Sequence, residues 1–190
     1  MAYGVNSPVA GFDVWGTVWS NSDFVNYYFD QDPSRSNDID TDQMGLTDLI
    51  LPVVRSAAEN AIDSVVRSLI NNANQSNGQG SQLIDPPFGV NCGSIVWAMG
   101  GGSGRAVGQI VYNWSIERFW YASHLYERKN YFWRFEGELQ YSDDFKDPMD
   151  IPNIIDKDFE VPFGRPYHYG HIWNNQFLYG DGYLWARMVE

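Results

Sequence analysis

The N-terminal half contains one long stretch in which apolar residues return every three or four positions. The stretch runs from Leu46 to Ile70 and builds one wide apolar face, while the opposite face is charged. This periodicity is typical of an amphipathic helix packed on a core. Pro52 either starts the main helix at its first turn, where a missing N–H is tolerated, or kinks a helix that begins earlier, and we favour the first. We therefore predict the main helix over 52–73, with Thr47 as a candidate cap before it.

The C-terminal half changes to the two-residue alternation of a half-buried strand. Between Tyr131 and Tyr141, aromatic and apolar residues alternate with polar ones, so this segment is predicted to turn one face to a core. Shorter apolar segments predict further strands at 95–99, 106–114, 116–126, 171–179 and 183–189. Turns between them are expected at the glycine run 100–104, at 127–130 and at Gly180-Asp181-Gly182.

These patterns predict an α+β fold in a single domain over 1–190. Its helical part covers about 1–75, a flexible linker rich in Asn, Gln, Ser and Gly covers about 71–82, and the sheet part covers about 83–190. The simplest arrangement is an antiparallel sheet, closed as a barrel or half-barrel and covered by the one long helix.

The first 45 residues give weaker signals. The segment 10–19 reads as a short strand or a core-packed loop, and Asp23 is a candidate cap for a short helix that carries Phe24, Tyr27 and Tyr28. The segment 30–42 is rich in Asp and is predicted to be a solvated loop, because it lacks the glycine and closing glutamate of a calcium-binding loop.

Composition narrows the class of protein. The 190 residues are 44% apolar, which suffices for a core, and the net charge of −12 opposes binding to nucleic acid and to anionic membrane surfaces. Cys92 is the only cysteine, so no intrachain disulfide forms, and it is predicted to be a buried small residue. We expect synthesis in the cytoplasm, without a signal peptide or membrane span, because no basic and apolar leader and no apolar run of about 20 residues occurs.

The candidate chemistry lies where the alternating strand ends. Four carboxylates follow it within a short distance: Asp143, Asp144, Asp147 and Asp150. Crowded carboxylates raise the proton affinity of at least one member, and they can act as a general base or hold a divalent ion. The segment 163–168 adds Arg165 and His168 in a turn before the next strand. The alternative is an ordinary solvated acidic turn.

Two other motifs fail their templates. The glycine run before Arg105 lacks the Lys-Ser/Thr and the following helix of a phosphate-binding loop, so we interpret it as a hairpin loop. His168 and His171 are three residues apart, and on a strand their side chains face opposite sides, which argues against a shared zinc ion.

The order of elements resembles the C-terminal toxin domain of colicin M and its relatives among bacterial polymorphic toxins. The resemblance rests on 26–29 (NYYF), on 133–147, where an aromatic strand leads into Asp143, Asp144 and Asp147, and on 164–167 (GRPY) before a strand. It covers about the last two-thirds of the chain. Lys146 stands where the family has a tyrosine, unless Phe145 takes that place, and no His-Arg pair follows Asp147.

The resemblance implies an antibacterial effector that hydrolyses a phosphodiester of lipid II, the peptidoglycan precursor. By position, Asp144 and Asp147 would be its acidic residues, with a divalent ion such as Mg²⁺ as cofactor. We add Asp143 from the same cluster, and Arg165 and His168 in place of the missing His-Arg pair, as candidate catalytic residues. It further implies a lipid-linked substrate, a cognate immunity protein, and delivery to a target cell's periplasm by a dedicated secretion apparatus. The alternative is a non-enzymatic binding protein, an accessory, immunity or structural component of a phage or secretion particle, that uses exposed Trp and Tyr as contact anchors. A third interpretation is carbohydrate binding on an aromatic platform.

Overall fold

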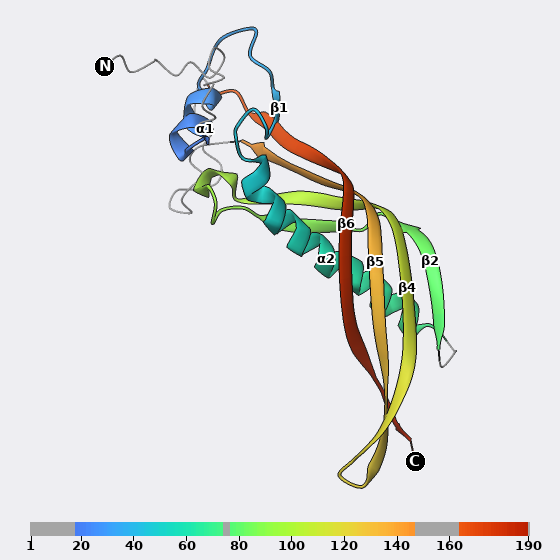
Figure 1. Ribbon diagram of the computed structural model, residues 1–190. Helices are drawn as coiled ribbons and strands as arrows, with labels where there is room; N and C mark the ends of the chain where they lie inside the picture. The colour runs from blue at the N-terminus through green and yellow to red at the C-terminus, as the bar shows by residue number, and fades with distance from the viewer. Residues whose placement is uncertain (1–17, 74–76, 147–163, 190) are drawn as a thin grey trace. The chain divides into compact units, whose positions relative to one another are not determined.

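The computed structural model describes residues 18–73, 77–146 and 164–189 (Figure 1). The predicted strand or loop at 10–19 therefore lies mostly outside the described residues, as do Asp147 and Asp150. Internal contacts divide the chain into two compact units. Unit 1 contains Met1–Val54, Gly89–Gly104 and Tyr141–His171, and unit 2 contains Arg55–Phe88, Arg105–Gln140 and Ile172–Glu190. No finding tests the predicted single domain, which stays a prediction.

Two α-helices, one 3₁₀ helix and six strands form the described structure. Their order is α1 (Asn21–Tyr28), β1 (Asp38–Asp40), α2 (Thr47–Asn71), β2 (Gly78–Ile84), β3 (Pro87–Asn91), η1 (Trp97–Met99), β4 (Gly101–Tyr121), β5 (His124–Phe145) and β6 (Tyr167–Val189). The predicted α+β class is therefore confirmed.

The strands form one open, mixed sheet in the order β1-β6-β5-β4-β2, with β3 also paired to β4. β2 runs antiparallel to β4, whereas β1 runs parallel to β6, with Asp38 opposite His168 and Asp40 opposite Gly170. The prediction of a purely antiparallel sheet, closed as a barrel or half-barrel, is wrong on both points. The parallel pair arises from β1. This strand lies within the segment that was predicted to be an acidic loop, and it pairs with a strand about 130 residues later in the chain.

The predicted helix is real, but it does not cover the C-terminal half. α2 has 25 residues, a length of about 38 Å, whereas β4, β5 and β6 have 21, 22 and 23 residues, about 70 Å each. Strands therefore dominate the fold. α2 also begins at Thr47 and includes Pro52, which was predicted to start it. The buried Ile50 anchors this extra first turn.

Unit 1 has an aromatic core gathered around α1. Ser20 precedes the helix, and its backbone N–H and hydroxyl both donate to the Asp23 carboxylate at 2.7 Å, so Asp23 closes the first turn rather than capping it. Phe24, Tyr27 and Tyr28 are buried, as predicted. The Tyr27 ring meets Tyr167 of β6 edge to face, with ring centroids 5.0 Å apart.

Unit 2 contains the alternating strand that the sequence predicts. Tyr131 and Trp133 of β5 are buried, and both donate hydrogen bonds to the Asp63 carboxylate of α2, at 2.8 and 3.2 Å. Lys129 donates to the carbonyls of Ile70 and Ala73 at the end of the helix, each at 3.0 Å. Cation donors suit this end of a helix, whose last carbonyls lack intrahelical partners.

Three predicted turns are wrong, two of them for the same physical reason. Gly180 and Gly182 lie inside β6, where a Cβ would come within 2.4 Å of the Trp133 ring and 2.5 Å of the Tyr131 hydroxyl. Gly102 likewise lies in β4, against Tyr141. These glycines make room for aromatic rings instead of bending the chain. The real β4–β5 turn is Ala122-Ser123, whose φ angles of 47° and 65° are left-handed, and not 127–130.

Two more segments differ from expectation. The second half of the predicted flexible linker forms β2, which starts at Gly78, and the predicted strand at 95–99 contains the 3₁₀ helix η1. No helix in the described part of the chain has both the length and the apolar character needed to cross a membrane.

Candidate functional site

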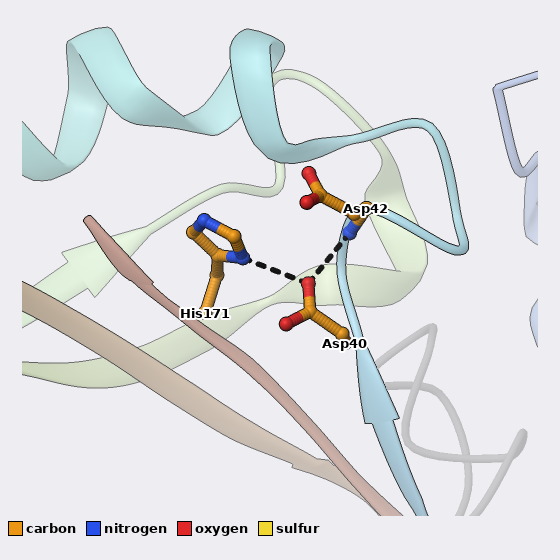
Figure 2. A group of neighbouring side chains, drawn as sticks. All are labelled: Asp40, Asp42 and His171. Atoms are coloured by element: carbon orange, nitrogen blue, oxygen red, sulfur yellow. Dashed lines mark hydrogen bonds and ion pairs between the residues drawn. The ribbon is translucent and has the colours of Figure 1, made fainter. Parts of the chain in front are cut away.

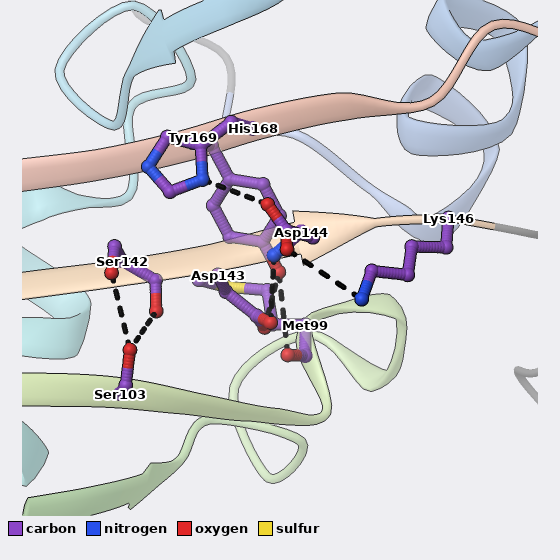
Figure 3. A network of polar contacts seen from close by, with 8 residues as sticks. All are labelled: Met99, Ser103, Ser142, Asp143, Asp144, Lys146, His168 and Tyr169. Carbon is purple, nitrogen blue, oxygen red and sulfur yellow. Dashed lines mark hydrogen bonds and ion pairs between the residues drawn. The ribbon is translucent and has the colours of Figure 1, made fainter.

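The end of β5 and the start of β6 bring an aspartate and a histidine together in unit 1 (Figure 3). Nδ1 of His168 lies 2.8 Å from Oδ1 of Asp144, and Nζ of Lys146 lies 3.7 Å from Oδ2 of the same carboxylate. The side chains of His168 and Asp144 are 46% and 51% exposed. This pair, which we call the Asp144–His168 dyad, is therefore accessible to a ligand.

The hydrogen bond from His168 has two consequences for the dyad. It lowers the pKa of Asp144, with further lowering by the charges of His168 and Lys146. When Nδ1 carries the proton donated to a carboxylate, Nε2 of a neutral imidazole is left with a lone pair. The dyad is thus arranged to accept a proton, or a bond to a ligand, at Nε2 of His168.

Asp143 faces the other way and is partly buried. The Tyr169 hydroxyl donates to its Oδ2 at 2.7 Å, and the backbone N–H of Asp144 donates to its Oδ1 at 2.8 Å (Figure 3). Burial nevertheless raises the pKa of Asp143, because it outweighs these hydrogen bonds. Adjacent aspartates of one strand therefore have pKa values shifted in opposite directions.

Behind Asp143 lies a group of buried hydroxyl and thiol side chains. Tyr169 and Cys92 are fully buried and Tyr141 is 2% exposed; burial raises the pKa of all three. The prediction that Cys92 is a buried small residue is confirmed. A raised thiol pKa keeps Cys92 protonated, which argues against a nucleophilic role.

Arg165 lies against the loop after α1 rather than against the dyad. Its Nη1 donates to the Asp32 carbonyl at 2.7 Å, and its backbone N–H donates to the Tyr28 carbonyl at 2.8 Å. The buried Arg35 donates to the Arg165 carbonyl at 3.0 Å. Of the five predicted catalytic residues, Asp143, Asp144 and His168 thus lie together, Arg165 contacts another loop, and Asp147 lies outside the described residues.

A second His–carboxylate pair lies three residues further along β6. Nδ1 of His171 is 2.7 Å from Oδ1 of Asp40, and the backbone N–H of Asp42 donates to the same oxygen at 2.9 Å (Figure 2). Asp40, Asp42 and His171 each offer one ligand atom, and these atoms lie within 4.8 Å of one another. His168 and His171 thus contact different carboxylates, those of Asp144 and Asp40.

The divalent ion implied by the resemblance does not fit the pair Asp143 and Asp144. Three of their four carboxylate oxygens accept hydrogen bonds, and the fourth faces the Lys146 cation. Among the described residues, the donor set that suits an ion is Asp40, Asp42 and His171. Because it includes an imidazole, it favours Zn²⁺ or Mn²⁺ over Mg²⁺.

Sequence reasoning missed the partners that lie far away along the chain. Asp40 and Asp42 were interpreted as part of a solvated loop, and Tyr169 and Tyr141 were not connected to Asp143. Only the parallel pairing of β1 with β6 brings Asp40 to His171. One local feature could have indicated the strand. Ile39, a single apolar residue between repeated aspartates in 38–42, is buried.

Comparison with known proteins leaves the family open. No family model matches the chain, and neither a curated protein nor a solved structure shows significant similarity to it. The resemblance to colicin M-like toxin domains therefore stays a prediction that rests on the residues quoted for it.

Proposed function

We propose that the chain is a hydrolase that cleaves a phosphodiester, with the Asp144–His168 dyad as its general base. The observation that carries this proposal is the contact of 2.8 Å between Nδ1 of an exposed histidine and a carboxylate. A histidine oriented in this way by a carboxylate is a recurrent general base in hydrolases.

In the proposed reaction, Nε2 of His168 takes a proton from a water molecule as the water oxygen attacks phosphorus. The new P–O bond forms while the ester P–O bond breaks, and the leaving oxygen takes its proton from solvent. Asp144 stabilises the imidazolium that results, because its negative charge lies at hydrogen-bonding distance from Nδ1. Lys146, beside Asp144, supplies a nearby positive charge for the phosphate.

The proposed substrate is lipid II, as the resemblance implies, in a target cell's periplasm reached through a secretion apparatus. Unit 1 opposes an anionic substrate, because its sequence has 4 basic and 15 acidic residues, a net charge of −11. Like charges slow association, and salt screens this repulsion. The proposal thus predicts faster cleavage as ionic strength rises from about 20 to 150 mM.

The test uses the purified chain with lipid II and follows the cleaved products by chromatography. We expect His168→Ala to reduce the rate about 10²–10⁴-fold, the range for loss of a general base, and Asp144→Asn to reduce it less. His124→Ala is the matched control, since His124 lies at the β4–β5 turn and its Nδ1 contacts only the Ala122 carbonyl among the described residues. Unchanged cleavage by His168→Ala rules the proposal out.

A parallel experiment expresses the chain in the cytoplasm or the periplasm of a test bacterium. Killing from the periplasm alone, lost in His168→Ala, supports lipid II as the substrate. If neither location gives killing, the alternative of a binding protein gains support. A separate observation favours that alternative: several aromatic side chains of unit 2 are more than half exposed, namely Trp120, Tyr121, Tyr179 and Trp185.

A further inference from the structure

β6 has a long edge with no strand beside it in the described part of the chain. Its neighbours in the sheet are β5 on one side and β1 on the other, and β1 pairs with residues 168–170 alone. From Ile172 onward the β1 side of the strand has no strand partner among the described residues. Unpaired N–H and C=O groups along such an edge are a template for another strand.

The direction of the free backbone groups follows from one contact and one break in the alternation of the strand. The Phe177 carbonyl accepts a hydrogen bond from Nη2 of Arg55 in α2 at 2.9 Å, so it does not point toward β5. Asn175, with φ at 54°, shifts the alternation, and Trp173 and Leu178 are both buried although they lie an odd number of positions apart. By the two-residue period, the edge groups after Phe177 belong to Tyr179, Asp181, Tyr183 and Trp185.

The same residues expose large aromatic side chains. Phe177, Tyr179, Tyr183 and Trp185 are 44%, 56%, 49% and 64% exposed. Natural edge strands are usually protected by lysine, proline or a covering element. Between 177 and 185 β6 has neither lysine nor proline, and its one charged residue is Asp181. In the part of the chain that the structure describes, Arg55 donates to one carbonyl of this edge, that of Phe177.

Charge favours a second copy of this chain as the occupant. Unit 2, which contains this edge, has 8 basic and 9 acidic residues, a net charge of −1, against −11 for unit 1. A contact made through unit 2 therefore joins two parts of nearly zero net charge, although each whole chain carries −12. Antiparallel pairing of two identical edges is two-fold symmetric, and cross-strand aromatic pairs stabilise it.

We infer that β6 pairs antiparallel with β6 of a second copy, through residues 179–185, to form a homodimer. The four partly exposed rings offer roughly 400 Å² per copy, since an aromatic side chain buries about 150–250 Å² in total. The two copies then bury roughly 800 Å² of ring surface, below the about 1,200 Å² of a standard interface. The dimer is therefore weak and depends on concentration.

Sedimentation velocity over a wide range of protein concentration tests the dimer. We expect the wild-type chain to change from monomer to dimer, and Tyr179→Lys and Tyr183→Lys each to weaken the dimer at least tenfold. Leu83→Lys on β2 is the matched control, because Leu83 is a 78% exposed apolar residue on the opposite end strand of the sheet. It should leave the dimer intact. Circular dichroism confirms that each variant is folded.

Hydrogen exchange provides a second measurement that needs no variant. The amides of 179, 181, 183 and 185 should exchange more slowly at high protein concentration than at low concentration. A chain that stays monomeric at millimolar concentration overturns the inference, as does a dimer that is lost in Leu83→Lys but kept in Tyr179→Lys. Protection of these amides only when a different protein is added also overturns it, because the occupant is then that protein.

Discussion

The two units use aromatic residues in opposite ways. In unit 1 the rings of Phe24, Tyr167 and Tyr169 are buried, and the Tyr169 hydroxyl holds the Asp143 carboxylate. In unit 2 Tyr131 and Trp133 are buried, whereas Trp120 and Trp185 are 72% and 64% exposed. The 16% aromatic content of the sequence is therefore divided between buried rings beside a polar network in unit 1 and a set of partly exposed rings in unit 2.

Charge is divided between the units in the same uneven way, with −11 in unit 1 and −1 in unit 2. The acidic unit holds both His–carboxylate pairs, while the nearly neutral unit holds the exposed rings and the free strand edge. Chemistry and self-association are thus expected in separate parts of the chain, and variants should affect one without the other.

The largest expected effect distinguishes buried from exposed tryptophan. Trp133 is 1% exposed and donates to Oδ1 of Asp63 at 3.2 Å, so Trp133→Ala leaves a cavity and removes one of the two hydrogen bonds to this oxygen, the other being from Tyr131. We expect it to lower the free energy of unfolding by about 3–5 kcal/mol. Trp185→Ala should change it by less than about 0.5 kcal/mol. Urea unfolding followed by circular dichroism measures both, and equal losses would contradict the burial assigned to these rings.

The second comparison uses one residue type in two environments. Arg35 is 4% exposed, lies over the Tyr27 and Tyr167 rings, and donates to the Tyr27 and Arg165 carbonyls. Arg35→Ala removes the donor to the Arg165 carbonyl and one of the two donors to the Tyr27 carbonyl, which keeps the Asp30 N–H, and should cost about 3 kcal/mol. Arg118, by contrast, is 66% exposed and pairs with Glu127 at 2.5 Å across the β4–β5 hairpin.

Exposed ion pairs contribute little, so Arg118→Ala should lower the free energy of unfolding by about 0.5 kcal/mol or less. The difference between Arg118→Ala and the wild type should vanish in about 1 M salt. The same urea titration, repeated with added salt, measures this. An Arg35→Ala chain as stable as the wild type would show that this arginine does not fix the loop after α1.

The sequence predicted the elements whose periodicity is local. The apolar face of 46–70 and the alternation of 131–141 both appear in the structure, because each depends on residues a few positions apart. The β1–β6 pairing was missed because it joins residues about 130 positions apart and uses only three residues of β1. The turn predicted at 180–182 is wrong because Gly180 and Gly182 make room for aromatic side chains of another strand, which local sequence does not reveal.

The candidate site was predicted in part for the same reason. Asp143, Asp144 and His168 stand at strand ends that the sequence identified, and the structure brings them together. The opposite surroundings of the two aspartates were not predictable, because they depend on Tyr169 and on the buried residues behind it. Arg165 was grouped with His168 by proximity along the chain, yet its guanidinium contacts Asp32.

A smaller effect concerns the pH dependence of stability. The pKa of Asp143 is raised by burial, so its ionisation destabilises the fold as pH rises through and above the ordinary carboxyl value of about 4. The pKa of Asp144 is lowered by His168, so it stabilises the fold above that value and loses this contribution as pH falls. Asp143→Asn should therefore gain stability at neutral pH, and Asp144→Asn should lose it.

Both differences from the wild type should shrink in acid, where the carboxyl groups are protonated. Urea unfolding at several pH values between about 3 and 7 measures them. The amide introduced by Asp143→Asn can be accommodated because the Tyr169 hydroxyl, which also lies 3.3 Å from the Met99 carbonyl, can rotate toward that acceptor. If Asp143→Asn loses stability at neutral pH but not in acid, the ionised Asp143 stabilises the fold, which contradicts the raised pKa assigned to its burial.

The smallest expected effect is that of Mg²⁺. Hydrogen bonds and Lys146 occupy the oxygens of Asp143 and Asp144, so Mg²⁺ at about 1 mM should not shift the unfolding midpoint through them. If Zn²⁺ or Mn²⁺ does shift the unfolding midpoint, Asp42→Asn should abolish the shift and Asp144→Asn should not. Of these two aspartates, Asp42 is the one that belongs to the group with His171. Thermal unfolding with and without each ion decides between the two carboxylate groups. If Mg²⁺ shifts the unfolding midpoint and Asp144→Asn abolishes that shift, the ion binds at the end of β5 and takes part in the chemistry of the Asp144–His168 dyad.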